Sequence, residues 1–255
     1  MSRLHKPKAG FWIRLCVVIL YPFDALIFRI RWHHLDRVTA PEDGGVIIAI
    51  NHISHVDTVL MARFVWQSGR VPRFMIKAGV FRKPIVGRIM KGAGQIPVYR
   101  GTTDAANSLR DAVTALEHGE AVVIYPEGTI TLDPEQWPMQ GKTGIARLVL
   151  LSPQTPVVPV GQWGAQPHKG HARWRALARR TAQASVGRPL DLSRYSGKEP
   201  TAAVLREITD VIMTAVRDRG RGRPRRDCTD GVLQAREEGR RQGLTSGATH
   251  RQGRT

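Results

Sequence analysis

The chain has 255 residues, of which 42% are hydrophobic, and 39 Lys and Arg against 21 Asp and Glu give a formal net charge of +18. This apolar content is enough for a buried core, which excludes a wholly disordered chain. The positive charge favours polyanionic partners: nucleic acid, anionic lipid headgroups or phosphorylated substrates. Charge alone does not choose among these three. The two cysteines, Cys16 and Cys228, form neither a disulfide framework nor the ligand spacing of a zinc site.

An apolar and aromatic segment, FWIRLCVVILYPFDALIFRIRW, occupies residues 11–32. Its longest uncharged stretch, residues 15–23, is far shorter than the roughly 20 residues that span a bilayer. We expect one or two short helices that meet near Pro22, within an N-terminal segment (1–44) that associates with a membrane surface through apolar side chains and arginines. The alternative is a helix that packs on the protein's own core.

From residue 45 onward, short apolar stretches alternate with stretches of helical periodicity. Strands are expected where apolar and β-branched residues run together, and helices where apolar residues recur three or four positions apart. In chain order the predicted elements are strand 45–50, helix 56–67, strands 73–77 and 95–100, helix 103–119, strand and turn 121–129, helix 142–152, strands 156–161 and 182–190, and helix 199–219. This order predicts an α/β domain over 45–219, with a mixed, largely parallel central sheet flanked by helices.

The C-terminal segment, residues 220–255, differs in composition from the rest. Glycine, arginine and polar residues dominate it and the apolar periodicity fades, which predicts a basic, disordered tail. Such a tail is more often a solvated end or an accessory membrane contact than a nucleic-acid-binding segment, so no specific nucleic acid partner is expected.

The segment NHISHVD, residues 51–57, places two histidines, a serine and an aspartate directly after a predicted strand. Five residues of a regular helix turn through about 500°, so His52 and Asp57 would point apart on one helix. They can meet only where the chain bends, and a junction between a strand and a helix supplies such a bend. The Asp57 carboxylate can then accept a hydrogen bond from one imidazole nitrogen and leave the other nitrogen free as a general base.

Two other interpretations of this segment stay open on its residues alone. The spacing of Ser54 and Asp57 matches a helix-capping pattern, in which Asp57 would only satisfy backbone amides. His52, His55 and Asp57 are also of the types that bind metals, although no second compact cluster supplies further ligands.

Four stretches of the chain resemble sequence blocks of the glycerolipid acyltransferases, the family that contains the 1-acylglycerol-3-phosphate acyltransferases. NHISHVD resembles the family's Asn-His-x-Ser-x-x-Asp block, and GAGQIPVYR its Gly-x-Ile-x-x-x-Arg block. YPEGT is similar to the Phe-Pro-Glu-Gly-Thr block, and VVPVG to the proline-containing apolar block that follows. All four stand in the family's order between residues 45 and 190, which makes the match specific.

The resemblance implies transfer of an acyl chain from acyl-CoA or acyl carrier protein to the free hydroxyl of 1-acylglycerol-3-phosphate, with phosphatidic acid as the product. The donor is a co-substrate, so neither a cofactor nor a metal is expected. The implied partners are this donor, a lysophospholipid acceptor and an anionic membrane surface, at the cytoplasmic face of the cell membrane. Ile130 stands where the family commonly has arginine, which leaves open another acceptor, such as a different lysophospholipid or a lipid-linked sugar. A non-catalytic basic module that binds membranes or nucleic acid is the alternative that the charge suggests.

Matched position by position, the resemblance assigns His52 as the general base and Asp57 as the residue that orients it. Arg100 falls on the position that binds the acceptor phosphate, for which a planar guanidinium is well suited. Lys77 matches a position that is often basic in the family and is a candidate phosphate contact. The block assigned to acceptor binding comprises Glu127, Gly128 and Thr129.

Two features lie outside these assignments. Lys142 precedes a predicted helix whose N-terminus can bind an anion. The segment ITLDPEQWPMQ, residues 130–140, contains aromatic and proline residues. We expect either a lid or membrane-facing loop there, or a structured surface loop.

Overall fold

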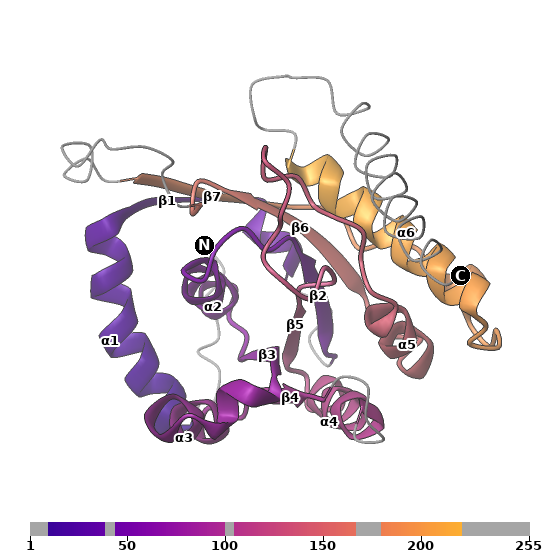
Figure 1. Cartoon of the computed structure of the whole chain (residues 1–255), viewed down its shortest axis with the longest axis horizontal. Coiled ribbons are helices and arrows are strands. Elements are labelled where there is room, and N and C mark those ends of the chain that lie inside the picture. The colour runs from indigo at the N-terminus through magenta and orange to yellow at the C-terminus, as the bar shows by residue number, and fades with distance from the viewer. Residues whose placement is uncertain (1–9, 39–43, 100–104, 167–179, 221–255) are drawn as a thin grey trace, which may run out of the picture. The chain divides into compact units, whose positions relative to one another are not determined.

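Figure 1 shows a computed structural model of the chain, which describes residues 10–38, 44–99, 105–166 and 180–220. Most of the predicted basic tail and the candidate residue Arg100 therefore lie outside the described residues. The described strands are β1 (Phe28–His33), β2 (Val46–Ile50), β3 (Pro72–Lys77), β4 (Ile96–Val98), β5 (Ala121–Ile124), β6 (Val157–Trp163) and β7 (Arg180–Val186).

These strands form one sheet in the order β1-β7-β6-β2-β5-β3-β4. Neighbouring strands are parallel in every pair except β6 and β7, which are antiparallel. The predicted α/β class with a mixed, largely parallel sheet is therefore confirmed.

Helices cover both faces of the sheet (Figure 1). The described helices are α1 (Phe11–Ile27), α2 (Asp57–Gln67), α3 (Pro84–Gly92), α4 (Ala105–Glu117), α5 (Gly144–Leu151) and α6 (Ala202–Arg219), with 3-10 turns η1 (Leu35–Val38), η2 (Ala78–Arg82) and η4 (Ser193–Tyr195). Side chains of α2 join the core on one face, and those of α4, α5 and α6 join the core on the other.

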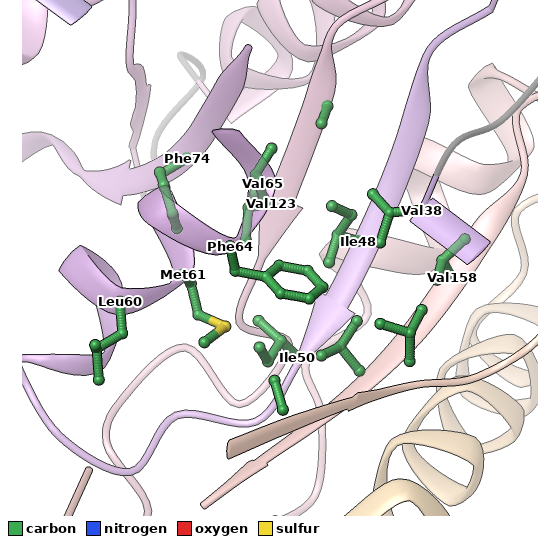
Figure 2. Packing of buried hydrophobic residues seen from close by; sticks show 14 of the residues in the cluster. Val38, Ile48, Ile50, Leu60, Met61, Phe64, Val65, Phe74, Val123 and Val158 are labelled. Carbon is green, nitrogen blue, oxygen red and sulfur yellow. The ribbon is translucent and has the colours of Figure 1, made fainter. Parts of the chain in front are cut away.

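The central strand β2 is buried on both faces, as expected of a parallel strand with helices above and below. Ile48 and Ile50 pack with Phe64 of α2 in one cluster, part of which Figure 2 shows. Ile47 and Ala49 point to the opposite face and belong to the second cluster. All five residues of β2 are at most 1% exposed. This fixed strand carries the segment that begins at Asn51.

The helix predicted over 11–32 is wrong at its C-terminal end. Helix α1 is continuous through Pro22 and ends at Ile27, and residues 28–33 instead form β1, which pairs with β7 in parallel. The physical reason is a two-residue alternation typical of a strand with one buried face. Phe28, Ile30 and Trp32 lie on the more buried side, and Arg29, Arg31 and His33 are exposed.

The predicted strands and helices between residues 45 and 219 all occur, with shifts of a few residues at their ends. Helix α3 was not predicted. Pro84 at its first position, where a missing N–H costs nothing, was the available signal.

Helix α1 packs on the protein with one side and exposes apolar side chains on the other. Ile13 and Asp24 are buried. The exposed apolar residues, each between 56% and 74% exposed, are Phe11, Val18, Ile19, Phe23 and Leu26. Within the four described ranges, no helix combines the length and the hydrophobicity needed to cross a bilayer.

The buried side of α1 carries an unpaired carboxylate. Asp24 is 1% exposed, and neither of its carboxylate oxygens has a hydrogen-bond partner among the described residues. It lines a largely apolar cavity of about 130 Å³ between α1, α2 and β3. Burial raises the pKa of Asp24 to about 6, against the opposing attraction of Arg63.

Because its folded-state pKa lies above the ordinary value of 3.8, Asp24 adds stability that is fully present below that value and is lost as the pH rises through 6. We expect Asp24→Asn to raise the free energy of unfolding by about 1 to 3 kcal/mol near pH 8 and to change it little near pH 4. Denaturant unfolding at the two pH values measures this difference. Asp111→Asn, at an exposed position of α4, is the matched control and should have little effect at either pH. Equal effects of Asp24→Asn at both pH values would contradict the assignment.

Candidate active site

The predicted site residues gather where parallel strands end. Asn51 and His52 follow β2, and Tyr125 follows β5, its parallel neighbour. In open α/β sheets, ligands bind beyond the carboxyl ends of such strands.

His52 and Asp57 are in direct contact across the bend between β2 and α2. The His52 Nδ1 atom lies 3.0 Å from both carboxylate oxygens of Asp57. Because a carboxylate only accepts hydrogen bonds, Nδ1 carries the hydrogen and Nε2 is left with a free lone pair. The Asp57 side chain is fully buried, whereas the His52 side chain keeps 16% of its surface exposed. The imidazole can therefore receive a proton from a ligand.

Asp57 also holds the turn that leads into helix α2. Its Oδ2 atom accepts hydrogen bonds from the backbone N–H of Ile53 (2.7 Å) and of Ser54 (3.0 Å). The Ser54 hydroxyl in turn accepts the N–H of Asp57 at 3.2 Å. This reciprocal pair has the hydrogen bonds of a capping box but lies in the turn before α2, whose N-cap residue is Val56. One carboxylate therefore both orients the imidazole and fixes the turn before the helix.

The metal-binding interpretation lacks a gathered ligand set. Over the parts of the chain that the structure describes, no three His, Cys, Asp or Glu side chains lie close enough to hold a metal ion. His55, which suggested such a site, is exposed.

Glu127 accepts hydrogen bonds from two backbone amides, one on each carboxylate oxygen. Its Oε1 atom accepts the N–H of His52 and its Oε2 atom the N–H of Met139, each at 2.9 Å. The residue is 2% exposed. Burial raises the pKa of Glu127 to about 7, although the two backbone hydrogen bonds act in the opposite direction.

The segment 130–140 is a structured loop held against the histidine. The backbone N–H of Thr131 donates to the carbonyl oxygen of His52 at 2.8 Å, and the Thr131 hydroxyl donates to the carbonyl of Trp137 at 2.7 Å. Leu132, next to Thr131, is 82% exposed. The loop is thus fixed by hydrogen bonds at Thr131 and exposes an apolar side chain at Leu132.

Tyr125 contacts both members of the pair. Its hydroxyl donates to Asp57 Oδ1 at 3.1 Å. Its ring stacks on the His52 imidazole, with 4.2 Å between the ring centroids and 26° between the planes. Burial raises the pKa of the Tyr125 phenol well above 10, and the charge of Asp57 adds to the effect, so the phenol stays protonated.

A basic cavity opens beside Tyr125. It has a volume of about 440 Å³, and its lining includes Gly128, Lys142 and Arg147. Gly128 has φ +70°, a conformation that favours glycine, and it closes the turn through its N–H to the carbonyl of Tyr125 at 2.9 Å. This turn therefore places Gly128 in the lining of the cavity together with Lys142 and Arg147.

The remaining predicted residues are less closely gathered. Thr129 is exposed and follows the turn. Lys77 is exposed at the end of β3, beside a second cavity of about 450 Å³ whose lining includes Arg82 and Lys91. Arg100 lies outside the described residues.

Sequence reasoning missed three contributors. The buried side chain of Asn51 exchanges hydrogen bonds with both backbone groups of Gln162, and nothing local signals this contact. The hydroxyl of Tyr125 was visible as a departure from the phenylalanine of the family block. Arg147 lies in α5 and lines the basic cavity, and no motif in the sequence marked it.

Comparison with known proteins identifies the family. The model of a family described as Acyltransferase matches residues 29–163, from β1 to the end of β6. The chain belongs to the acyltransferase family. The match contains the His52–Asp57 pair (the dyad), Tyr125 and the turn through Gly128.

Relatives of this acyltransferase chain are distant. It is 25% identical over 175 residues to the chloroplastic 1-acyl-sn-glycerol-3-phosphate acyltransferase of Arabidopsis thaliana, a match that covers 65% of this chain and 46% of that protein. It therefore spans less than half the length of that relative. It is 27% identical over 183 residues to the 1-acyl-sn-glycerol-3-phosphate acyltransferase of Bacillus subtilis, over 69% of this chain and 84% of that protein.

The fold of this acyltransferase is also similar to a solved structure. The 1-acyl-sn-glycerophosphate acyltransferase of Thermotoga maritima superposes with a TM-score of 0.59 over 84% of this chain and 81% of that one. The sequence identity is 18%, so this likeness concerns the fold.

Each oxygen of the Glu127 carboxylate accepts one backbone N–H, from His52 or from Met139. In Glu127→Gln the side-chain amide has one oxygen, so it cannot accept both N–H groups. One buried donor then loses its partner, at a cost of about 1 to 3 kcal/mol. We expect faster hydrogen exchange at the amides of His52 and Met139 and a lower free energy of unfolding. Glu135→Gln, at an exposed position of the same loop, is the control. Unchanged exchange at both amides in Glu127→Gln would show that these hydrogen bonds do not hold the loop.

Proposed function

We propose that the chain transfers an acyl group from a thioester donor, acyl-CoA or acyl carrier protein, to the free hydroxyl of 1-acylglycerol-3-phosphate and so forms phosphatidic acid. The observation that carries this proposal is the His52–Asp57 pair, held at the carboxyl end of β2 with Nε2 available. Membership of the acyltransferase family and the activity for which the two relatives are named support the choice of reaction and acceptor.

In the proposed mechanism, Nε2 of His52 takes the proton of the acceptor hydroxyl. The oxygen attacks the thioester carbonyl, the carbon–sulfur bond breaks, and the leaving thiolate receives the proton from the imidazolium. Asp57 holds the tautomer and stabilises the transient positive charge, as an orienting carboxylate does. No covalent bond to the protein forms.

The acceptor phosphate calls for cations close to the dyad. The cavity beside Tyr125 offers Lys142 and Arg147. We also retain Arg100, Lys77 and Thr129, with Glu127, as acceptor-binding candidates on the strength of the family resemblance. Ile130 favours a second possibility, the same chemistry on a different lysophospholipid or on a lipid-linked sugar.

Acyl chains and lysophospholipids are presented at membranes, and α1 offers an apolar side to such a surface. Val18 and Leu26 are 70% and 74% exposed. The exposed side also carries Arg14, which suits anionic headgroups. We therefore propose that α1 lies in the headgroup region of an anionic, cytoplasm-facing membrane.

Acyl transfer to a panel of acceptors tests the function. We expect purified chain to acylate 1-acylglycerol-3-phosphate in preference to other lysolipids, and His52→Ala to lower kcat/KM by about 10² to 10⁴. His55→Ala, at the exposed histidine of the same segment, should keep full turnover. Full turnover by His52→Ala with every acceptor would overturn the role of the histidine, and preference for another acceptor would select the second possibility.

Vesicle binding tests the membrane proposal. We expect the triple change Val18→Ser, Phe23→Ser and Leu26→Ser to weaken co-sedimentation with anionic vesicles at least tenfold, because the apolar area that enters the headgroup region is lost. Leu151→Ser, at a 56% exposed position of α5, should bind as the unchanged chain does. Equal binding by the triple variant would exclude α1 as the membrane contact.

A further inference from the structure

Tyr125 is placed to act on the base through both its polar and its apolar part. The phenol donates to Asp57 Oδ1, and the ring lies on the His52 imidazole. We propose that Tyr125 is a positioning residue that tunes how readily His52 takes up a proton. This inference rests on the proposed function, in which His52 is the base.

Asp57 shares its negative charge among several hydrogen-bond donors. The buried carboxylate accepts hydrogen bonds from the imidazole, from two backbone N–H groups and from the hydroxyl of Tyr125. Each donor draws electron density from the oxygens, so a phenol on Oδ1 weakens the attraction that remains for the imidazolium. The hydroxyl of Tyr125 thereby favours neutral His52, which is the form that acts as a base.

The ring has the opposite effect. An aromatic face stabilises a cation stacked on it, so the ring of Tyr125 favours protonated His52. The ring is itself held, because Phe74 stacks on Tyr125 with 6.4 Å between centroids and 20° between planes. Stacking also restrains rotation of the imidazole and keeps Nδ1 on Asp57.

The hydroxyl is separable from the ring in this chain. The resembling family block has phenylalanine where YPEGT has Tyr125, so the ring alone is compatible with the fold of this turn. The phenol stays a donor at working pH, because burial and the charge of Asp57 hold its pKa well above 10. Of the four donors named above, it alone comes from the end of a different strand, β5.

The decisive variant is Tyr125→Phe in the full chain. We expect the acid limb of the pH profile of kcat/KM to move up by about 0.5 to 1 pH unit, while the plateau rate stays within about threefold. Tyr125→Leu removes the ring as well, and we expect its acid limb to lie below that of Tyr125→Phe and its plateau to fall at least tenfold.

Tyr195→Phe is the matched control. Tyr195 is buried and donates to a carboxylate, Glu207 Oε1 at 2.7 Å, but it belongs to the core on the other face of the sheet. Removing its hydroxyl should leave the pH profile in place. A shift in the control as large as in Tyr125→Phe would mean that loss of stability moves the profile, and the inference would be overturned.

NMR titration of the His52 imidazole measures the same effect without turnover. A midpoint that rises in Tyr125→Phe supports the inference even if the chain acylates no acceptor, an outcome that would remove only the proposed function. A midpoint that is unchanged within about 0.2 pH unit, or that falls, overturns the inference even if the enzyme is active.

Discussion

The backbone that leaves strand β2 at Ile50 has to find hydrogen-bond partners in a buried place, and the site is built around that need. Inside the sheet, β2 pairs with β5 on one side and with β6 on the other, but residues 51–54 have left these strand pairs. Buried backbone groups without partners would cost free energy comparable to lost hydrogen bonds. Side chains and the neighbouring loop supply the partners: Gln162 for Asn51, Glu127 and Thr131 for His52, and Asp57 for Ile53 and Ser54.

The carboxylates that meet this structural need are the same ones that shape the chemistry. Asp57 holds the turn before α2 and at once fixes the tautomer of His52, so these two roles cannot be separated by a substitution at Asp57. Glu127 holds both His52 and the loop at Met139 by accepting a hydrogen bond from each backbone N–H. A carboxylate with both oxygens committed to backbone acts on a ligand mainly by placing the histidine and the loop. The acceptor-binding role proposed for Glu127 would then be exerted through that placement.

Local patterns predicted much of this arrangement, and long-range contacts account for what they missed. The run of apolar residues before Asn51 was enough to predict a strand and a bend. The spacing of His52 and Asp57 left an oriented base, a helix cap and a metal site open, and the family resemblance favoured the base. The strand over residues 28–33 was not predicted, because its apolar residues follow those of helix α1 directly and no loop separates the two elements. The contacts of Tyr125 with Asp57 and of Asn51 with Gln162 join strand ends that are 68 and 111 residues apart, so no spacing within one segment could signal them.

Helix α2 connects the dyad to the N-terminal segment. It begins with Asp57, and along its length it is held by α1 and by β1. Arg63 donates to the carbonyl of Tyr21 in α1 and lies over that ring, and Gln67 accepts the indole N–H of Trp32 in β1 at 2.6 Å. Because α1 passes directly into β1, which is paired with β7 in the sheet, α1 is held at its end as well as along its buried side. If α1 lies in the headgroup region, as proposed, these contacts would hold His52 and Asp57 at a fixed distance from the lipid surface. The link between the membrane contact and the general base would then be rigid.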